Sequence, residues 1–224
     1  SQSMQLDSIF PASGDTLFLA TDNLPERIEL GREGKNRNWN FINLKAPYAR
    51  PIAVKSGKQV SPYLESDIVV LQIDEEEWRY LRKTEEGLEL TGGQNVTPLP
   101  LGIVAEHIYR PPLLEQPAML EYGDEWSSKS TLYIPFSTKG VTLDLLKQLP
   151  VRADSLRFRI AVERNSEVDA SGQLILPGGI FDVLRVKRVE VQDIALDAKT
   201  CTDDWQDVTD LAADFQGARK RRLT

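Results

Sequence analysis

The chain is poor in the side chains on which many enzymes and metal centres depend. Its 224 residues include a single cysteine, Cys201, and a single histidine, His107. An intrachain disulfide is therefore impossible, and a closed zinc site, which takes several cysteine or histidine ligands, lacks them. A Ser-His-Asp or Cys-His arrangement would have to use His107, whose apolar neighbours favour a structural role. We predict a protein without catalytic residues, metal ligands or a cofactor.

Two weaker chemical interpretations depend on acidic residues. Asp203 and Asp204 follow Cys201 closely, and their charges disfavour its thiolate, so a nucleophilic role is not expected. With Asp207 they could offer oxygen ligands to calcium, but the EF-hand spacing is absent. The two carboxylates of a glycoside hydrolase can lie far apart in a chain. A hydrolase with scattered carboxylates therefore stays open as the weakest alternative.

A basic surface and a long apolar run are missing as well. The formal net charge is −7, which argues against a general polyanion binder, so we expect no nucleic-acid partner. A basic cluster, Arg219–Arg222, follows an acidic stretch near the C-terminus, and a solvated charged tail is the expected outcome. No apolar run approaches the about 18 residues of a transmembrane helix, so no membrane-spanning segment is predicted.

The clearest pattern in the chain is an alternation of apolar and charged residues that begins at Ser155. Phe158, Ile160 and Val162 alternate with charged residues, which is the period of a half-buried strand. The polar stretch Arg164–Gly172 then predicts a loop or a wide hairpin turn.

A tight turn and a long strand are expected next. Pro177–Gly179 predicts a tight reversal, because proline fixes φ and glycine allows positive φ. Ile180–Val191 reads as one long strand in which Phe181 packs into the core. Its valines change phase, which favours a β-bulge near Lys187–Arg188.

Three segments of the chain resemble a known group of proteins. Gly172–Val186 resembles the G-x-L-x-x-P-x-G-x-(F/Y)-x-V-L-R-V hairpin of uncharacterised exported proteins from bacteria that use type IX secretion. Phe10–Leu17 is similar to their P-x-x-G-D-T opening strand, and Asn38–Leu44 to their W-D-F-S-x-L turn. The resemblance implies an exported, β-rich protein that is located outside the cytoplasm, and it implies no known chemistry.

The rest of the chain also favours strands. Asp15–Ala20, the nearly all-apolar Asp67–Ile73 and the alternating Leu132, Ile134 and Phe136 each predict one. Prolines make Lys45–Pro62 a poorly paired connection at a sheet edge, and others break the chain after Arg110. Thr142–Leu149 is the one helical candidate. We predict an all-β fold, a mostly antiparallel sandwich or open curved barrel with at most one short helix. Residues 1–200 form a single domain, and 201–224 a charged tail.

Aromatic residues provide the candidate binding site. Trp78 and Tyr80 share one face of a predicted strand with Arg82, and exposed rings there would form a stacking platform for sugars or for side chains of a partner. Trp126, in a predicted loop, is a second candidate with the same ambiguity. The common alternative for all of these rings is burial in the core.

Together these observations favour a non-enzymatic module of the cell envelope that binds a protein or glycan partner. Through the resemblance, an accessory or cargo of an outer-membrane secretion system is included. The alternative is a periplasmic carrier of a lipid or small molecule, which would need an enclosed apolar cavity of several hundred Å³.

Overall fold

A computed structural model describes residues 3–6, 10–21, 29–45, 48–96, 104–141, 146–147, 149, 153–199, 204–210 and 220–223. Its elements are β1 Ser3–Gln5, β2 Thr16–Thr21, β3 Gly34–Asn40, β4 Tyr48–Ser56, α1 Gly57–Val60, β5 Ile68–Gln72, β6 Trp78–Lys83, β7 Gly87–Val96, β8 Val104–Pro117, β9 Met119–Glu121, β10 Glu125–Ser137, the 3₁₀ helix η2 Thr138–Gly140, β11 Ser155–Leu176, β12 Gly179–Lys199, β13 Gln206–Asp207 and β14 Lys220–Leu223. The expected helix Thr142–Leu149 and the residue Cys201 fall largely or wholly outside these ranges.

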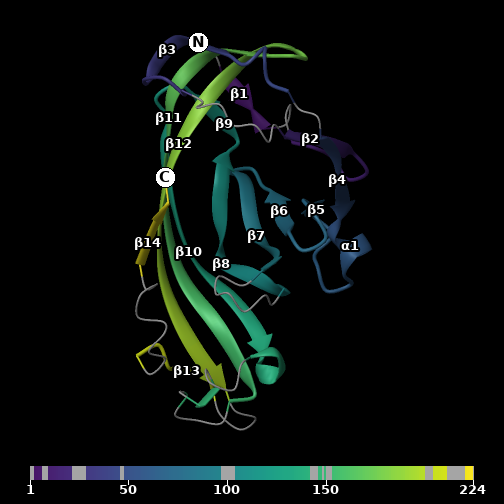
Figure 1. Ribbon diagram of the computed structural model, residues 1–224, viewed down its shortest axis with the longest axis vertical. Coiled ribbons are helices and arrows are strands. Elements are labelled where there is room, and N and C mark those ends of the chain that lie inside the picture. Colours follow the sequence, from purple (N-terminus) through teal and green to yellow (C-terminus); the bar gives the residue numbers. More distant parts are fainter. Residues whose placement is uncertain are drawn as a thin grey trace.

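One bent sheet of 12 strands makes up most of the molecule. Its order is β13-β12-β11-β10-β8-β7-β6-β5-β4-β2, with β14 beside β12 and β3 beside β11, and β1 pairs with β9 in a separate ribbon. The long strands β10, β11 and β12 curve along one side, and the shorter β4 to β7 lie opposite them (Figure 1). The prediction of an all-β, mostly antiparallel fold is confirmed, and the sheet does not close into a barrel.

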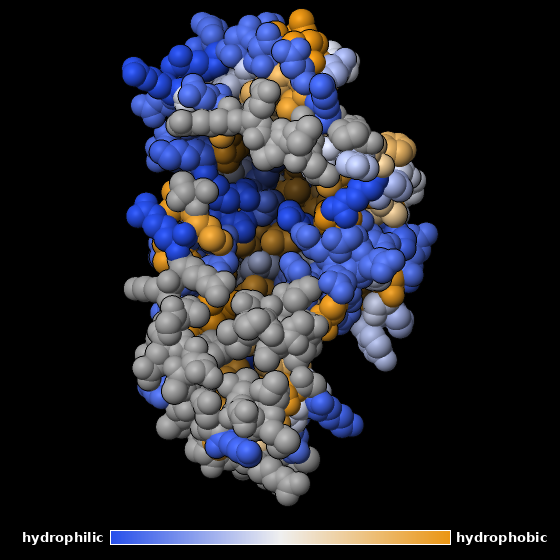
Figure 2. Space-filling view, viewed as in Figure 1, coloured by the Kyte–Doolittle hydropathy of each residue, from blue (hydrophilic) through white to orange (hydrophobic). Residues whose placement is uncertain are grey.

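The main apolar core lies on the concave face of the long strands. Leu132, Ile134 and Phe136 are at most 8% exposed, as the alternation in β10 predicts. Residues of β8, β11 and β12 belong to the same cluster, and so does Val208 from the C-terminal stretch. In the space-filling view, the middle of the molecule is hollowed, with apolar residues in its depth and hydrophilic residues along its rim (Figure 2).

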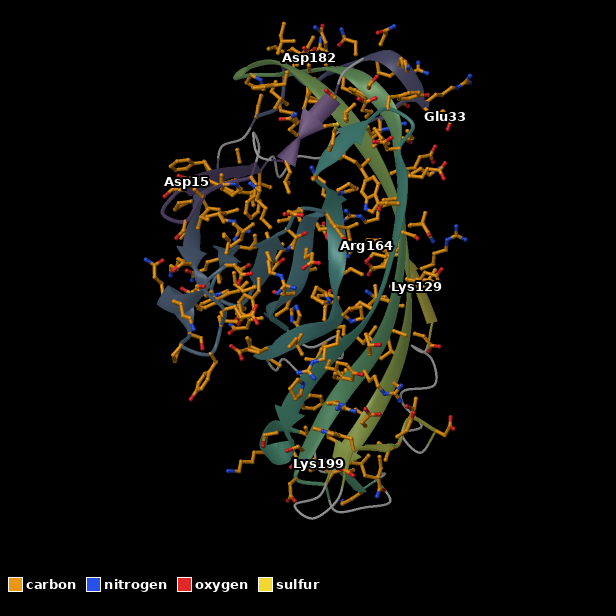
Figure 3. All side chains as sticks on the ribbon, turned by 180° about the vertical axis from the view of Figure 1, so that it is seen from behind. Asp15, Glu33, Lys129, Arg164, Asp182 and Lys199 are labelled. Carbon is orange, nitrogen blue, oxygen red and sulfur yellow. The ribbon has the colours of Figure 1, made fainter. Side chains whose placement is uncertain are left out.

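Residues 155–199 form two very long strands joined by one tight turn. Leu176 pairs with Gly179, whose φ is +152°, so the tight turn at Pro177–Gly179 is confirmed. The prediction of a loop at Arg164–Gly172 is wrong, because β11 continues through these residues and pairs with β12. Asp182, near the start of β12, and Lys199, at its end, lie at opposite ends of the molecule (Figure 3).

The bulge lies on the opposite strand from the expected one. Pairing with β12 skips Asp169, and the register of β12 itself stays regular through Lys187–Arg188. Asp169 is 7% exposed and accepts two hydrogen bonds from Arg185, at 2.7 and 3.0 Å. The Arg185 guanidinium also donates to the carbonyl oxygen of Leu30 at 2.5 Å. The extra residue thus anchors the segment that leads into β3.

Prolines do not break the sheet where the sequence suggests. β4, within the stretch expected to be poorly paired, pairs with both β2 and β5. β8 continues through Pro111 and Pro112. Its pairing with β7 is interrupted between Ile108 and Leu113, so a missing proline N–H removes no hydrogen bond from that ladder. The carbonyl oxygen of Pro111 instead accepts a hydrogen bond from the Ser130 hydroxyl.

The C-terminal stretch, expected to be a solvated tail, contributes to the sheet in its described part. Both β13 and β14 pair antiparallel with β12. Val208 and Thr209 are each 2% exposed, and the Thr209 hydroxyl accepts a hydrogen bond from the backbone N–H of Leu196. The apolar side chain of Val208 joins the main core, which explains why this acidic stretch packs. Among the described residues, no helix has the length and apolarity needed to cross a membrane.

Candidate functional site

A half-open pocket of about 440 Å³ lies where β5, β6, β7 and β8 meet. Its lining is mainly apolar and includes four aromatic side chains. These are Tyr63 from the loop after α1, Tyr80 from β6, and His107 and Tyr109 from β8. Polar groups reach it from Arg82, Thr91 and Glu106. A concave, mostly apolar site with a few convergent polar groups is typical of small-molecule recognition.

Two of the four predicted binding residues line this pocket. Tyr80 and Arg82 contribute to its wall, and Trp78 packs beside it against a small core cluster that contains Tyr80. The open platform of two exposed rings is not formed, because Tyr80 is 6% exposed and Trp78 is half-buried. Trp126, on β10, is half-buried opposite Ser166 and is not part of the pocket lining.

The tyrosine of β6 connects to the acidic residue of β8. The Tyr80 hydroxyl donates a hydrogen bond to Glu106 Oε1 at 3.3 Å. Burial, together with the negative charge of Glu106, raises the pKa of Tyr80 to about 12. The phenol therefore stays protonated at neutral pH, and it serves as a hydrogen-bond donor.

Burial also determines the state of the only histidine. It lowers the pKa of His107 to about 4, so the imidazole is neutral at pH 7. The ring lies edge-on to Tyr109, with 6.0 Å between the ring centroids. The apolar neighbours of His107 predict a structural role, and in the structure its side chain is half-buried. Its ring nevertheless contributes to the wall of the pocket.

Glycine makes room for the histidine. Gly93 on β7 pairs with Arg79 on one side and with His107 on the other. A Cβ atom at Gly93 would collide with the carbonyl oxygen of Trp78 and come within 3.0 Å of His107 Nε2. The Gly92-Gly93 pair lies inside β7, where the close approach of β6 and β8 requires glycine.

Arginine charge at the pocket is already neutralised. Arg82 donates to Glu89 Oε2 through Nε and Nη2, at 3.0 and 2.9 Å, and to Glu65 Oε2 at 3.2 Å. A ligand in this pocket therefore meets a protonated phenol, a neutral imidazole and the carboxylate of Glu106. These groups suit a neutral ligand with several hydroxyl groups better than an anion.

Sequence reasoning missed Tyr63, Glu106 and Tyr109. The alternation of polar and aromatic residues around His107 predicts a strand that contains Glu106. It does not indicate which strand will lie beside that strand. The pairing of β8 with β7, and of β7 with β6, brings these residues to Tyr80.

Metal chemistry and known relatives provide no further assignment. Within the part of the chain that the structure describes, no group of three His, Cys, Asp or Glu residues could hold a metal ion. No family model, no curated protein and no solved structure matches the chain. The candidate site is therefore defined by its geometry.

Proposed function

We propose that this protein is a non-enzymatic module of the cell envelope that binds a glycan in the pocket between β5 and β8. The observation that supports this most directly is the combination of aromatic rings with neutral donors and the carboxylate of Glu106 in a half-open pocket of about 440 Å³. Apolar ring faces suit the C–H faces of sugars, and the polar groups suit their hydroxyls.

Tyr63 supplies the outer wall in this proposal. Its side chain is 95% exposed although it lines the pocket, so it contributes little to the core. A large aromatic ring at the mouth of an apolar pocket is suited to stacking on a ligand that enters from solvent. Glu106, which is also exposed, retains acceptor capacity beyond its bond with Tyr80.

The location outside the cytoplasm rests on the resemblance of Gly172–Val186, Phe10–Leu17 and Asn38–Leu44 to exported proteins of type IX-secreting bacteria. A role as an accessory or cargo of that secretion system belongs to the same proposal. An enrichment of the protein in the envelope or culture supernatant of its native host would support it, and an exclusively cytosolic pool would contradict it.

A glycan array tests the pocket assignment. Labelled full-length protein is applied to immobilised microbial and plant oligosaccharides, and the strongest ligand is then titrated by calorimetry. We expect Tyr63→Ala to weaken binding at least about tenfold, which is about 1.4 kcal/mol. Tyr48→Ala is the matched control, because Tyr48 is 66% exposed and lies outside the pocket. No binding to any glycan, or equal loss in both variants, contradicts the proposal.

The carrier of a small apolar molecule remains the second candidate. The mainly apolar lining, with Ile68, Ile108 and Pro112, favours it, whereas the pocket is half-open instead of enclosed. Titration with a fluorescent fatty acid separates the two functions. Saturable binding that Ile108→Asp abolishes, together with no glycan binding, would favour the carrier.

A further inference from the structure

Strand β2 forms one end of the 12-stranded sheet and is exposed along its whole length. It pairs with β4 on one side, and no other strand of the described residues pairs with its outer side. All six residues, Thr16–Thr21, are exposed to solvent, including Phe18 at 73%. Asp15, directly before β2, lies on the side of the molecule away from the long strands (Figure 3).

The hydrogen-bonding phase of β2 can be read from its pairing with β4. The backbone N–H of Val54 donates to the carbonyl oxygen of Asp15, at 3.1 Å. The backbone N–H and C=O groups of successive residues in an antiparallel strand point to alternate sides. Those of Leu17 and Leu19, two and four residues after Asp15, therefore also point toward β4. The N–H and C=O groups of Thr16, Phe18 and Ala20 therefore point outward, where a further strand could pair.

β2 lacks the features that normally protect an edge strand. The sequence TLFLAT contains no charge and no proline, and its pairing with β4 shows no bulge. Exposed, regular, apolar edges of this kind promote pairing with another strand. Leu17 and Leu19 are each 38% exposed, beside the still more exposed Phe18.

The sequence of β2 is nearly symmetric about its third residue. Thr16 and Ala20 are small, Leu17 and Leu19 are identical, and Phe18 lies at the centre. If a two-fold axis perpendicular to the sheet relates two copies of β2, each side chain stays on the same face of the joined sheet. Residues that lie opposite one another must then be on the same face, which requires that the sum of their residue numbers is even. Pairing centred on Phe18 satisfies this rule and places leucine opposite leucine on one face and phenylalanine opposite phenylalanine on the other.

We propose that two copies of this chain associate through β2, antiparallel, with Phe18 opposite Phe18 of the second copy. In this register the outward groups of Thr16 meet those of Ala20 of the second copy, so three residue pairs form ladder hydrogen bonds. Leu17 packs against Leu19 of the second copy. A chain of net charge −7 repels its own copies in general, but an uncharged strand is suited to approach itself.

The association is expected to be weak and concentration-dependent. Stable specific interfaces bury about 800 Å² on each partner, and a six-residue edge buries less than that. The dimer should therefore dissociate on dilution. This inference does not depend on the glycan pocket, which lies on other strands.

Sedimentation velocity over a range of concentrations tests the proposal on the full chain. We expect a concentration-dependent dimer for the wild type. In Phe18→Lys, two like charges lie opposite one another, and dimerisation should weaken at least about tenfold. Ile180→Lys is the control, because Ile180 is 63% exposed at the tip of the long hairpin. A monomer at all concentrations, or equal dimerisation in Phe18→Lys, overturns the proposal, as does equal loss in the control.

Disulfide cross-linking tests the register itself. In a Cys201→Ser background, we expect an equimolar mixture of Leu17→Cys and Leu19→Cys to form cross-linked dimers, because these positions face each other within disulfide distance. Neither variant alone should cross-link. Cross-linking of Leu19→Cys alone would overturn the register centred on Phe18. Absence of cross-linking in the mixture, or cross-linking only to a strand of another protein in a cell extract, would overturn self-association.

Discussion

The two halves of the long hairpin bury the same face with opposite chemistry. From Leu156 to Val162, the concave face of β11 is apolar, and Ile194 and Leu196 of β12 continue it. At Arg164 and Ser166 the same face becomes polar, yet Arg164 is only 8% exposed and Glu190, its partner on β12, only 9%. One continuous buried surface therefore has an apolar half and an ionic half.

The ionic half depends on specific partners. Arg164 donates to Glu190 Oε2 at 2.7 Å and to Glu115 Oε2 at 2.5 Å, and Arg188 donates to Glu115 Oε1 at 2.7 Å. Glu115 comes from β8, and Arg164 lies where the long strands face that strand (Figure 3). An apolar side chain packs against any apolar neighbour, whereas a buried charge requires an oppositely charged group at a defined position. The ionic half therefore fixes where β8 crosses the hairpin.

The largest expected effect lies in the apolar half. Phe158 is fully buried and stacks on Phe136, with 5.2 Å between ring centroids. Phe158→Ala should lower the free energy of unfolding by about 4 kcal/mol, because it removes a buried ring and leaves a cavity. Urea denaturation measures this change. A loss below about 1 kcal/mol would show that the apolar half is loosely packed.

The second effect breaks the ionic half. Arg164→Met should lower the free energy of unfolding by about 3 kcal/mol, because it leaves Glu190 buried without its cation. Lys129→Met is the control, since Lys129 pairs with Glu163 on the exposed face, where the side chains are 72% and 49% exposed, and its loss should be about 0.5 kcal/mol or less.

Acid titration distinguishes the two halves further. Burial by itself raises the pKa of Glu115, but the charges of Arg188 and Arg164 outweigh it and hold that pKa below its ordinary 4.5. The stabilisation from this lowered pKa is present above about 4.5 and is lost as the pH falls through the folded value. The difference in free energy of unfolding between wild type and Arg164→Met should therefore become smaller in acid. The corresponding difference for Phe158→Ala should not change. If the free energies of unfolding of both variants depend on pH in the same way, the assigned role of the Glu115 ion pairs is contradicted.

The smallest effect lies at the hairpin tip. The sequence favours Phe181 as a core residue, but in the structure it is 49% exposed. Phe181→Ala should therefore lower the free energy of unfolding by less than about 1 kcal/mol, which urea denaturation again measures. A loss as large as that of Phe158→Ala would restore the expectation from sequence and place the tip in the core.

The errors of sequence reasoning follow a common cause. Alternation correctly placed Leu132, Phe158 and their neighbours in the core, because each buried apolar residue needs only an oily environment. The stretch Arg164–Gly172 looks like a loop because its partners are invisible locally: Glu190 is 26 residues away and Glu115 is 49 residues away. The predicted grouping of binding residues was incomplete for a similar reason. The period of two grouped Tyr80 with Arg82, but not with Glu106.

The amino-acid sequence alone determined that this protein is built from strands, where its apolar faces begin, and that the chain reverses at Pro177–Gly179, since these depend on side-chain period and on backbone φ. Only the tertiary structure decided that a charged stretch belongs inside, that prolines lie within paired strands, and that a pocket forms around Tyr80 and His107. Those outcomes depend on strand pairing between distant segments, and neither local period nor composition specifies which strands become neighbours.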